Sequence, residues 1–514
     1  METRMGILPY RGRNDIPVSF IYDGKKYEGF SDDMNPRKRF RRLDSNLTLT
    51  TVTANLDCLE IRVEYIEYKD FPVTEWVAYF ENTSQEKSKI LSDFRIGCGV
   101  VKTDDDVALT YSNGDNGNNT GYEFFEDDLK KPFVLHPNDT GCSCAGASPF
   151  MRLHGSTGGI NIAVGWTGTW IAEFEKVDGG VKVGFGQKRC HMVLNPGEVM
   201  RTPRINFEGY VGDEAHGRNM WRRFFMKHIC VKDPDGQTLP PKLCMHVFGA
   251  DGFPEFTGAT EENQIRGIRA YIKEGVKPDI WWLDAGWYPC GDHEWPLIGT
   301  WEVNKVNFPN GLAPIGEECK KNNIQFLLWF EPERVVAGTW LEQNHPEWLL
   351  RRPDPNDPNI LFNYAIPEAL DWMTERINKI IKESGVNIYR QDFNYDPRPS
   401  WEFHETEDRI GAIENLHIQG YYKIWDEIIL RNPGLWIDTC ASGGRRNDPE
   451  TLRRSIPLHY TDVEYGVHPV KQKQHRYMFE WIPYFRAHNR SWDVDGEMVW
   501  FSDDPFYNFH VDDF

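Results

Sequence analysis

From residue 243 onward the sequence repeats one unit, a short apolar run followed by an amphipathic segment. The apolar runs have the length of strands and occupy 243–248, 279–284, 324–330, 386–392, 435–439 and 458–461. Apolar residues recur at helical spacing in the intervening segments 260–274, 312–322, 367–384 and 418–430, and a short helix is expected at 449–455. Strands that alternate with helices indicate a parallel sheet. With this many units and no Gly-x-Gly-x-x-Gly loop, we predict a TIM-type (β/α)8 barrel instead of an open doubly wound sheet.

The first half of the chain has a different pattern. Short runs of alternating apolar and polar residues are separated by turns rich in Gly, Asn and Asp, for example at 47–53, 59–68, 76–81, 170–174 and 181–185. We interpret this part as a β-sandwich that ends in a linking helix at 214–228. A chain of 514 residues exceeds one ordinary core, so 1–235 is assigned to the sandwich and 236–514 to the barrel. The stretch 113–119 is interpreted as a loop with no further role.

Charge and cysteine content restrict the partners. The formal net charge of −20 argues against nucleic acid and against an anionic membrane, because both require basic patches. No run reaches the roughly 18 apolar residues of a membrane helix, and no signal peptide is visible at the start, so a cytoplasmic location is expected. Cys142 and Cys144 are too close for a zinc pair and no His cluster accompanies them. We therefore expect no metal and no cofactor, and the sequence leaves a homo-oligomer open.

Polar residues collect where the predicted strands end. In chain order they are Asp284, Glu331 and Glu333, Asp392, the turn 440–444 and Asp462. The carboxyl ends of barrel strands form the mouth where barrel enzymes carry their chemistry. Each residue alone is compatible with a helix cap or a surface ion pair, but together they predict a carboxylate-lined pocket with tryptophan walls. Arg390 precedes Asp392 by two positions, so these two side chains are expected on one face of their strand.

Four strings in this order resemble glycoside hydrolase family 36, the bacterial-type α-galactosidases or melibiases. They are WWLDAGWY at 281–288, WFEPE at 329–333, YRQD at 389–392 and CASGGRRND at 440–448. The resemblance covers nearly the whole chain. It implies a β-sandwich followed by a TIM-type barrel, and a retaining exo-hydrolase that releases terminal α-linked galactose from oligosaccharides or glycoconjugates.

The resemblance also implies roles for individual residues. Asp392 is the expected nucleophile and Asp462 the expected acid/base of a double displacement. The surroundings of Asp462 should raise its pKa, whereas Arg390 should keep Asp392 ionised. Substrate contacts are expected from Asp284, Trp287, Trp329, Arg390, Cys440 and Gly443. For three of these positions a local alternative stays open: helix capping for Asp284, core packing for Trp329, and a tight turn for the glycines.

Two substitutions leave the exact sugar open. Ala285 stands where the family has a second Asp, and Arg390 stands where it has Lys. Both positions are expected to read galactose hydroxyls. The alternatives are an α-N-acetylgalactosaminidase on the same scaffold and, from a different class, a galactoside-binding protein with weak catalysis. A transglycosylase is less compatible with the bacterial-type strings.

The end of the chain departs from a full barrel. A seventh strand is expected at 481–486, and no further helix-then-strand unit follows it; the last residues carry several aspartates with Gly496 and Pro505 between them. We therefore expect an eighth strand to be absent and the first and seventh strands to have unpaired edges. Impaired activity, or dependence on a partner chain, is the expected consequence.

Overall fold

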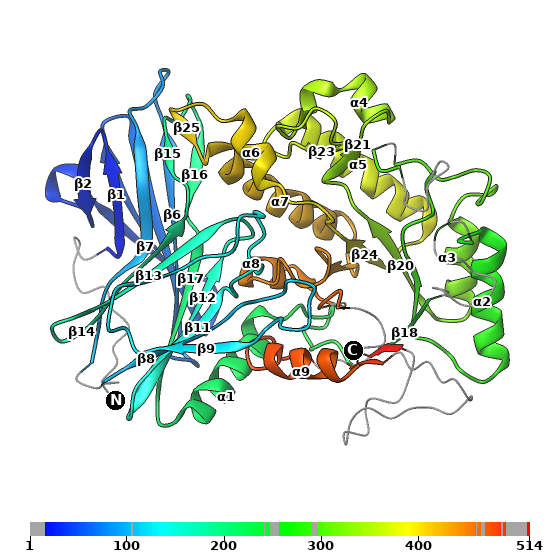
Figure 1. The fold of residues 1–514 in the computed structure, drawn as a ribbon, viewed down its shortest axis with the longest axis horizontal. Helices are drawn as coiled ribbons and strands as arrows, with labels where there is room; N and C mark the ends of the chain where they lie inside the picture. Colours follow the sequence, from blue (N-terminus) through cyan, green and yellow to red (C-terminus); the bar gives the residue numbers. More distant parts are fainter. Residues whose placement is uncertain are drawn as a thin grey trace.

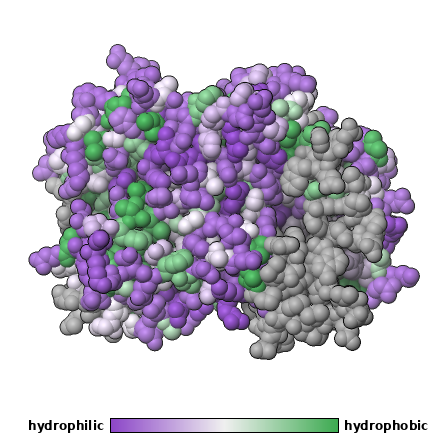
Figure 2. All heavy atoms as spheres, in the orientation of Figure 1, coloured by the Kyte–Doolittle hydropathy of each residue, from purple (hydrophilic) through white to green (hydrophobic). Residues whose placement is uncertain are grey.

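The structure, a computed structural model, describes residues 16–103, 106–240, 242–246, 256, 258–289, 297–299, 301–458, 460–463, 468–484, 487–489 and 511–513. An all-strand part stands beside a part in which helices surround a central sheet (Figure 1). The face drawn in Figure 2 is largely hydrophilic, in keeping with a chain of which 26% is charged. No helix in the described residues is long and apolar enough to cross a membrane.

Two large antiparallel sheets form the N-terminal part. The first contains β10 (Phe133–Leu135), β13 (Trp170–Val177), β14 (Gly180–Gln187), β7 (Leu91–Lys102), β1 (Val18–Tyr22) and β2 (Lys25–Glu28), in that order. The second contains β3 (Arg37–Arg42), β4 (Leu47–Leu56), β5 (Leu59–Tyr68), β6 (Val73–Asn82), β17 (Arg204–Val211), β12 (Gly158–Gly165), β11 (Phe150–His154), β8 (Ala108–Ser112) and β9 (Phe124–Asp127). Side chains from both sheets meet in one core, where the rings of Phe185 and Phe207 lie 5.6 Å apart. The predicted runs 170–174 and 181–185 lie in β13 and β14, which form a hairpin with Val177 paired to Gly180.

The linking helix begins where predicted and ends in a wider turn. Helix α1 spans Glu214–Phe224, and the Asp213 side chain caps it by accepting from the amide of His216. A π-helical turn, η2 (Phe225–Ile229), continues it. The indole of Trp221 donates to the carbonyl of Trp481 at 2.8 Å, so this helix packs against the far end of the chain.

The second part contains the predicted parallel sheet. Strands β18 (Leu243–His246), β19 (Ile280–Leu283), β20 (Gln325–Phe330), β24 (Ile388–Gln391), β26 (Trp436–Thr439) and β27 (Ser455–Ile456) pair in parallel and in that order. The connecting helices are α2 (Glu261–Lys273), α3 (Ala313–Lys321), α5 (Pro367–Ser384), α7 (Ala412–Arg431) and the short α8 (Pro449–Leu452). β19, β24 and β26 are buried at every residue, as expected for strands covered on both faces.

The sixth strand lies earlier than predicted. It is β27, at Ser455–Ile456, and the predicted run 458–461 is irregular in its described residues. The amide of Leu458 donates to the Asp438 side chain at 2.7 Å instead of a neighbouring strand. Thr461 forms an isolated bridge with Gly443. These two contacts draw the chain out of the sheet and across the strand ends.

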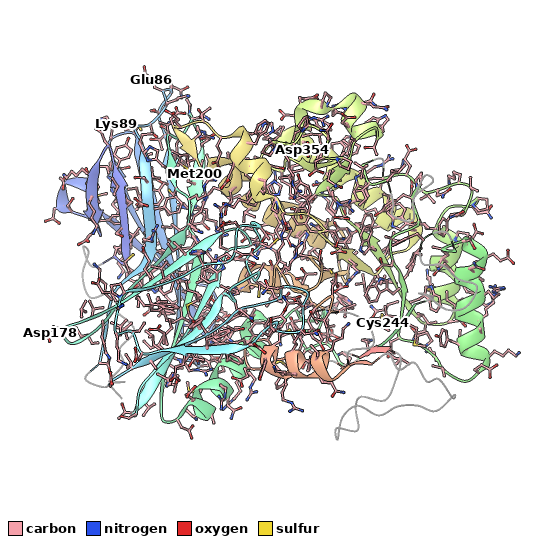
Figure 3. All side chains as sticks on the ribbon, viewed as in Figure 1. Glu86, Lys89, Asp178, Met200, Cys244 and Asp354 are labelled. Atoms are coloured by element: carbon pink, nitrogen blue, oxygen red, sulfur yellow. The ribbon has the colours of Figure 1, made fainter. Side chains whose placement is uncertain are left out.

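Elements that periodicity did not predict lie beside the sheet. A small sheet combines β21 (Arg334–Val336), β23 (Asn359–Phe362) and β22 (Leu349–Leu350), accompanied by α4 (Trp340–Asn344) and η3 (Pro346–Trp348). After β24 come α6 (Arg398–His404) and β25 (Arg409–Ile410). β25 pairs with β15 (His191–Met192) of the sandwich, so backbone hydrogen bonds join the two parts. Met200 on β16 (Val199–Arg201), labelled in Figure 3, is buried where β16, which pairs with β6 of the second sheet, meets α7.

The end of the chain differs from the prediction in two respects. Residues 481–484 are not a strand, because the amides of Trp481 and Ile482 close the end of α9 (His468–Met478) on the Met478 carbonyl. β29 (Val511–Asp513) pairs antiparallel with β18 and with β28 (Ala487–Asn489), so the first parallel strand is not an open edge. In the residues that the structure describes, the sheet therefore has eight strands, and the expected loss of the eighth is not confirmed. Residues 490–510 lie outside the described residues.

Candidate active site

Asp392 follows β24 directly and is buried, with 7% of its surface exposed. Four hydrogen bonds converge on its carboxylate: from the amides of Phe393 (2.7 Å) and Ser442 (3.0 Å), the indole of Trp329 (3.2 Å) and the side-chain amide of Asn394 (2.8 Å). Burial raises the pKa of Asp392, but the charge of Arg390 and these hydrogen bonds outweigh burial and leave the pKa below its ordinary value. The result is a fixed and ionised carboxylate.

Arg390 lies among carboxylates, on the face of β24 that the sequence predicted. Its guanidinium donates to buried Asp438 and lies 3.8 Å from Asp284. It also stacks 4.2 Å above the ring of Trp282. An arginine held in this way cannot swing out of the site, so its charge acts at one position.

Asp284 lies at the end of β19 and is partly exposed. Its oxygens accept from the Trp282 indole and from the amide of Ala285, both at 2.8 Å. Burial and the charge of Asp392 raise its pKa to about 6, against the opposing charge of Arg390. It does not cap a helix, so the capping alternative is wrong, and its location beside Arg390 leaves it available to a ligand.

The two predicted wall tryptophans are both buried. Trp287 is 0% exposed and Trp329 is 1% exposed. Trp287 donates to the carbonyl of Trp329 at 2.7 Å, and Trp329 donates to Asp392. In this structure the two rings and Asp392 are linked in sequence by these hydrogen bonds, which matches the core-packing alternative more closely than a wall against a sugar ring.

The turn 440–444 wraps around Asp392. The Cys440 thiol contributes to the lowered pKa of Asp392, and its sulfur accepts from the Gly443 amide at 3.2 Å. Ser442 and Gly443 both have positive φ, at 51° and 86°. A Cβ at 443 would lie 2.6 Å from the backbone nitrogen of Asp462, so only glycine fits there. The turn thus brings the two predicted catalytic residues to one place.

Asp462 comes directly after Thr461, whose backbone is bridged to Gly443. Unlike Asp392, it is exposed to solvent. Although water reaches the side chain, the protein packed around the carboxyl and then the charge of Asp392 raise its pKa to about 6, against Arg390, Lys471 and Arg445. One carboxyl is therefore held ionised and a neighbouring one is biased towards its protonated form.

Three groups of contacts that support this site were not predicted: those of Glu331 with Asn394 and Arg334, those of Glu333, and those of Asp115. Glu331 accepts from the amide of Asn394 and binds Arg334 through both oxygens. Glu333 binds Arg446 and His417, which lowers its pKa to about 2 despite burial. The strand-end position of both glutamates was visible, but their partners were not. Asn394 was also visible in principle, because it lies two positions after Asp392.

The third group corrects the reading of the sandwich loop 113–119. Asp115 from this loop is fully buried in the second part of the molecule, where it accepts from the amide of Gly444 and the hydroxyl of Thr461. The loop is therefore more than a connection. Polar composition alone carried no sign of this, because the partners lie more than 300 positions away in the sequence.

Among the described residues, no cluster of three or more His, Cys, Asp or Glu side chains is arranged to hold a metal. All cysteines among the residues that the structure describes are free thiols.

Comparison with known proteins points to one family. The melibiase family model matches residues 260–475. Among curated relatives, alpha-galactosidase Mel36A of Lactobacillus acidophilus is 28% identical over 79% of this chain and 56% of its own length. Alpha-galactosidase AgaA of Geobacillus stearothermophilus is 24% identical over 77% of this chain and 54% of its own length. The probable alpha-galactosidase C of Aspergillus flavus is 27% identical over 65% and 43%. The chain thus spans about half the length of these relatives.

Solved structures agree on the fold. The crystal structure of GH36 alpha-galactosidase AgaA superposes with a TM-score of 0.71 at 19% identity, covering 90% of this chain and 66% of that one. The complex of an AgaA variant with stachyose gives a TM-score of 0.74 at 18% identity, covering 94% and 70%. The four strings described above all lie within residues 260–475, the part of the chain that matches the melibiase family model, and the curated relatives that the chain resembles are named alpha-galactosidases.

Proposed function

We propose that the protein is a retaining exo-hydrolase of terminal α-galactosides. The observation that carries the proposal is the pair formed by buried, ionised Asp392 and exposed Asp462, whose pKa responds to the Asp392 charge. Retaining glycosidases require two carboxyl groups about 5–5.5 Å apart, of which one attacks and the other carries a proton. The names of the relatives support the substrate class: the curated matches are called alpha-galactosidases, and AgaA variants were solved with stachyose and with raffinose.

In the first step Asp392 attacks the anomeric carbon while Asp462 donates its proton to the glycosidic oxygen. The bond to the leaving alcohol breaks and a galactosyl ester forms on Asp392. In the second step Asp462, now a carboxylate, takes a proton from water, and the water oxygen displaces Asp392. Galactose leaves with its anomeric configuration retained, and both carboxyls return to their starting states.

The electrostatic coupling suits Asp462 to both steps. While Asp392 is ionised, its charge raises the pKa of Asp462 and favours the acid form. Once Asp392 is esterified its charge is gone, so the pKa of Asp462 should fall and favour the base form. The hydrogen bonds from Ser442 and Trp329 hold the attacking carboxylate at one position throughout.

The remaining contacts suit a neutral sugar. Asp284 and Arg390 lie beside each other and provide an acceptor and a donor for hydroxyl groups. The turn 440–444 lines the same space next to Asp392. We keep Asp284, Arg390, Cys440 and Gly443 as proposed substrate contacts. The roles that we propose for Trp287 and Trp329 are to hold the nucleophile.

The test is turnover of an aryl α-galactoside beside its 2-acetamido analogue, with the anomer of the first product identified by NMR. We expect the α-galactoside to be preferred and α-galactose to form first. An activated 2-fluoro-galactoside should label Asp392. Asp392→Asn should abolish turnover, and Asp371→Asn, at an exposed carboxylate on α5, serves as the matched control. Preference for the acetamido substrate would favour the N-acetylgalactosaminidase, and galactose binding without turnover would favour a binding protein.

A further inference from the structure

The loop between β8 and β9 leaves the sandwich and enters the candidate active site. At its centre Asp115 is 0% exposed. One of its oxygens accepts from the amide of Gly117 and the hydroxyl of Thr461, both at 2.9 Å, and the other accepts from the amide of Gly444 at 2.7 Å. Asp115 thus links the turn beside Asp392 to the residue that precedes Asp462.

The packing here is so close that it excludes side chains. A Cβ at Gly443 would lie 2.6 Å from the Asp115 carboxylate and also 2.6 Å from the Asp462 nitrogen. A Cβ at Gly444 would lie 2.0 Å from the Tyr122 hydroxyl. The two glycines therefore let the sandwich loop and the Asp462 segment both pack directly against one turn.

Further contacts hold the same segment from the sandwich side. Tyr122 donates to the carbonyl of Tyr460 at 2.8 Å, and Gln474 on α9 donates to the carbonyl of Asn118 at 2.6 Å. The backbone before Asp462 is therefore fixed at Tyr460 and at Thr461 by two residues of one loop. Such contacts set the position of a side chain on an otherwise irregular segment.

We infer that Asp115 is a positioning residue for Asp462, and that the sandwich loop 113–122 is a built-in part of the catalytic centre. The inference rests on the proposed function in one respect, namely that Asp462 is the acid/base. It assigns the sandwich a role in the chemistry that the sequence alone did not indicate.

The charges around Asp462 give the sign of the expected effect. Facing it are Asp392 and Arg390 at the end of β24, Arg445 after the turn, Lys471 on α9 and Asp115 from the sandwich loop. Burial raises the pKa of Asp115 to about 6, with a contribution from the Asp462 charge, so Asp115 is ionised at neutral pH. Its negative charge then favours the protonated form of Asp462. Replacing Asp115 by Asn should lower the pKa of Asp462.

The experiment compares Asp115→Asn with Asp178→Asn in the full chain. Asp178 is exposed in the turn between β13 and β14 of the sandwich, so the control makes the same substitution outside the loop 113–122. For a galactoside with a poor leaving group, Asp115→Asn should lower kcat by about 10- to 100-fold, the cost of a misplaced catalytic group. The basic limb of its pH profile should move to lower pH. A dinitrophenyl galactoside should lose much less, and Asp178→Asn should behave like the wild type.

An unchanged basic limb, or an equal loss with both leaving groups, overturns the inference. Should Asp115→Asn fail to fold, Thr461→Val removes the hydroxyl that binds Asp115 while keeping the shape and the charge of Asp115. For this variant a larger loss with the poor leaving group than with the dinitrophenyl galactoside supports the inference, and equal losses overturn it. Amide hydrogen exchange tests the inference without any enzymatic activity, because the Gly444 amide donates directly to Asp115. Faster exchange at 442–444 and 460–462 is expected in Asp115→Asn, and unchanged exchange there also overturns the inference. If the wild-type chain has no galactosidase activity, the proposed function is wrong. The hydrogen-exchange comparison still shows whether Asp115 holds the backbone of the turn and of the Asp462 segment.

Discussion

The pH dependence of the first chemical step follows from the two carboxyls. Asp462 must carry a proton when the leaving group departs, and its pKa is about 6. The protonated fraction therefore falls to about a tenth at pH 7 and about a hundredth at pH 8, so kcat/KM for a poor leaving group should fall about tenfold per pH unit above 6. On the acidic side the low pKa of Asp392 keeps the nucleophile ionised, so activity should persist below pH 5 for as long as the fold does.

The substitution Asp462→Ala tests whether Asp462 causes the fall of kcat/KM above pH 6, the basic limb of the pH profile. General acid catalysis is worth about 10²–10⁴ in rate, and that factor should be lost for a methoxyphenyl galactoside. A dinitrophenyl galactoside needs little protonation, so its first step should fall far less. The basic limb near pH 6 should disappear from the profile of the variant.

The assay measures kcat/KM from pH 4 to 9 for both substrates, with wild type and variant in parallel. Asp284 and Asp115 also have raised pKa values of about 6, so the wild-type profile alone does not identify the group. If Asp462→Ala keeps the basic limb, that limb belongs to Asp284 or Asp115 instead. Equal losses for both leaving groups would refute the role of Asp462 as the acid.

Three further predictions concern the groups around the nucleophile. Trp329→Phe keeps a ring but removes the donor to Asp392, so kcat should fall roughly 10- to 100-fold, in line with about 1.5–3 kcal/mol for a hydrogen bond to a charge. Trp340→Phe, at an exposed ring, is the control. Equal rates for the two variants would contradict a role of the Trp329 hydrogen bond in holding Asp392. Arg390→Met removes the guanidinium that neutralises buried Asp438 and should cost about 3–5 kcal/mol in urea unfolding, with the acid limb moved to higher pH. Arg376→Met on α5 should cost at most about 1 kcal/mol, and similar costs would argue against the buried pair. Glu333 has a folded pKa of about 2 against an ordinary 4.5, so its stabilisation is present above pH 4.5 and is lost as the pH falls towards 2. Glu333→Gln should therefore be less stable at pH 7 and lose less stability between pH 5 and 3, and parallel curves for the two proteins would refute this.

Local signals determined much of the second part of the chain. Helix α5 has the predicted bounds, with Pro367 in its first turn and Gly385 ending it at a φ of 69°. Thr260 caps α2 by accepting from the amide of Asn263. Proline, glycine and capping residues act over a few positions, so the printed sequence contains all that they need. The order of the strand-end carboxylates followed from the same local reading.

Other features were decided only by tertiary contacts. The sixth strand is displaced because Asp438 accepts from the amide of Leu458, and β29, from the last residues of the sequence, pairs with β18. Trp287 and Trp329 resembled sugar-facing rings in the sequence, yet both are buried behind Asp392. Burial depends on which segments pack together, and periodicity does not report that.

The candidate site shows the same division. The chain order alone placed Asp392 and Arg390 on one face of a strand, because the period of a strand is two. The raised pKa of Asp462 and the position of Asp115 required the fold, since both depend on charges and donors that are distant in sequence but within a few ångströms in space. The sequence determined which residues carry the proposed chemistry. The packing of the sandwich loop against the turn 440–444 decided how these residues are held. Short-range electrostatics and hydrogen bonds act only between groups that the tertiary structure brings into contact.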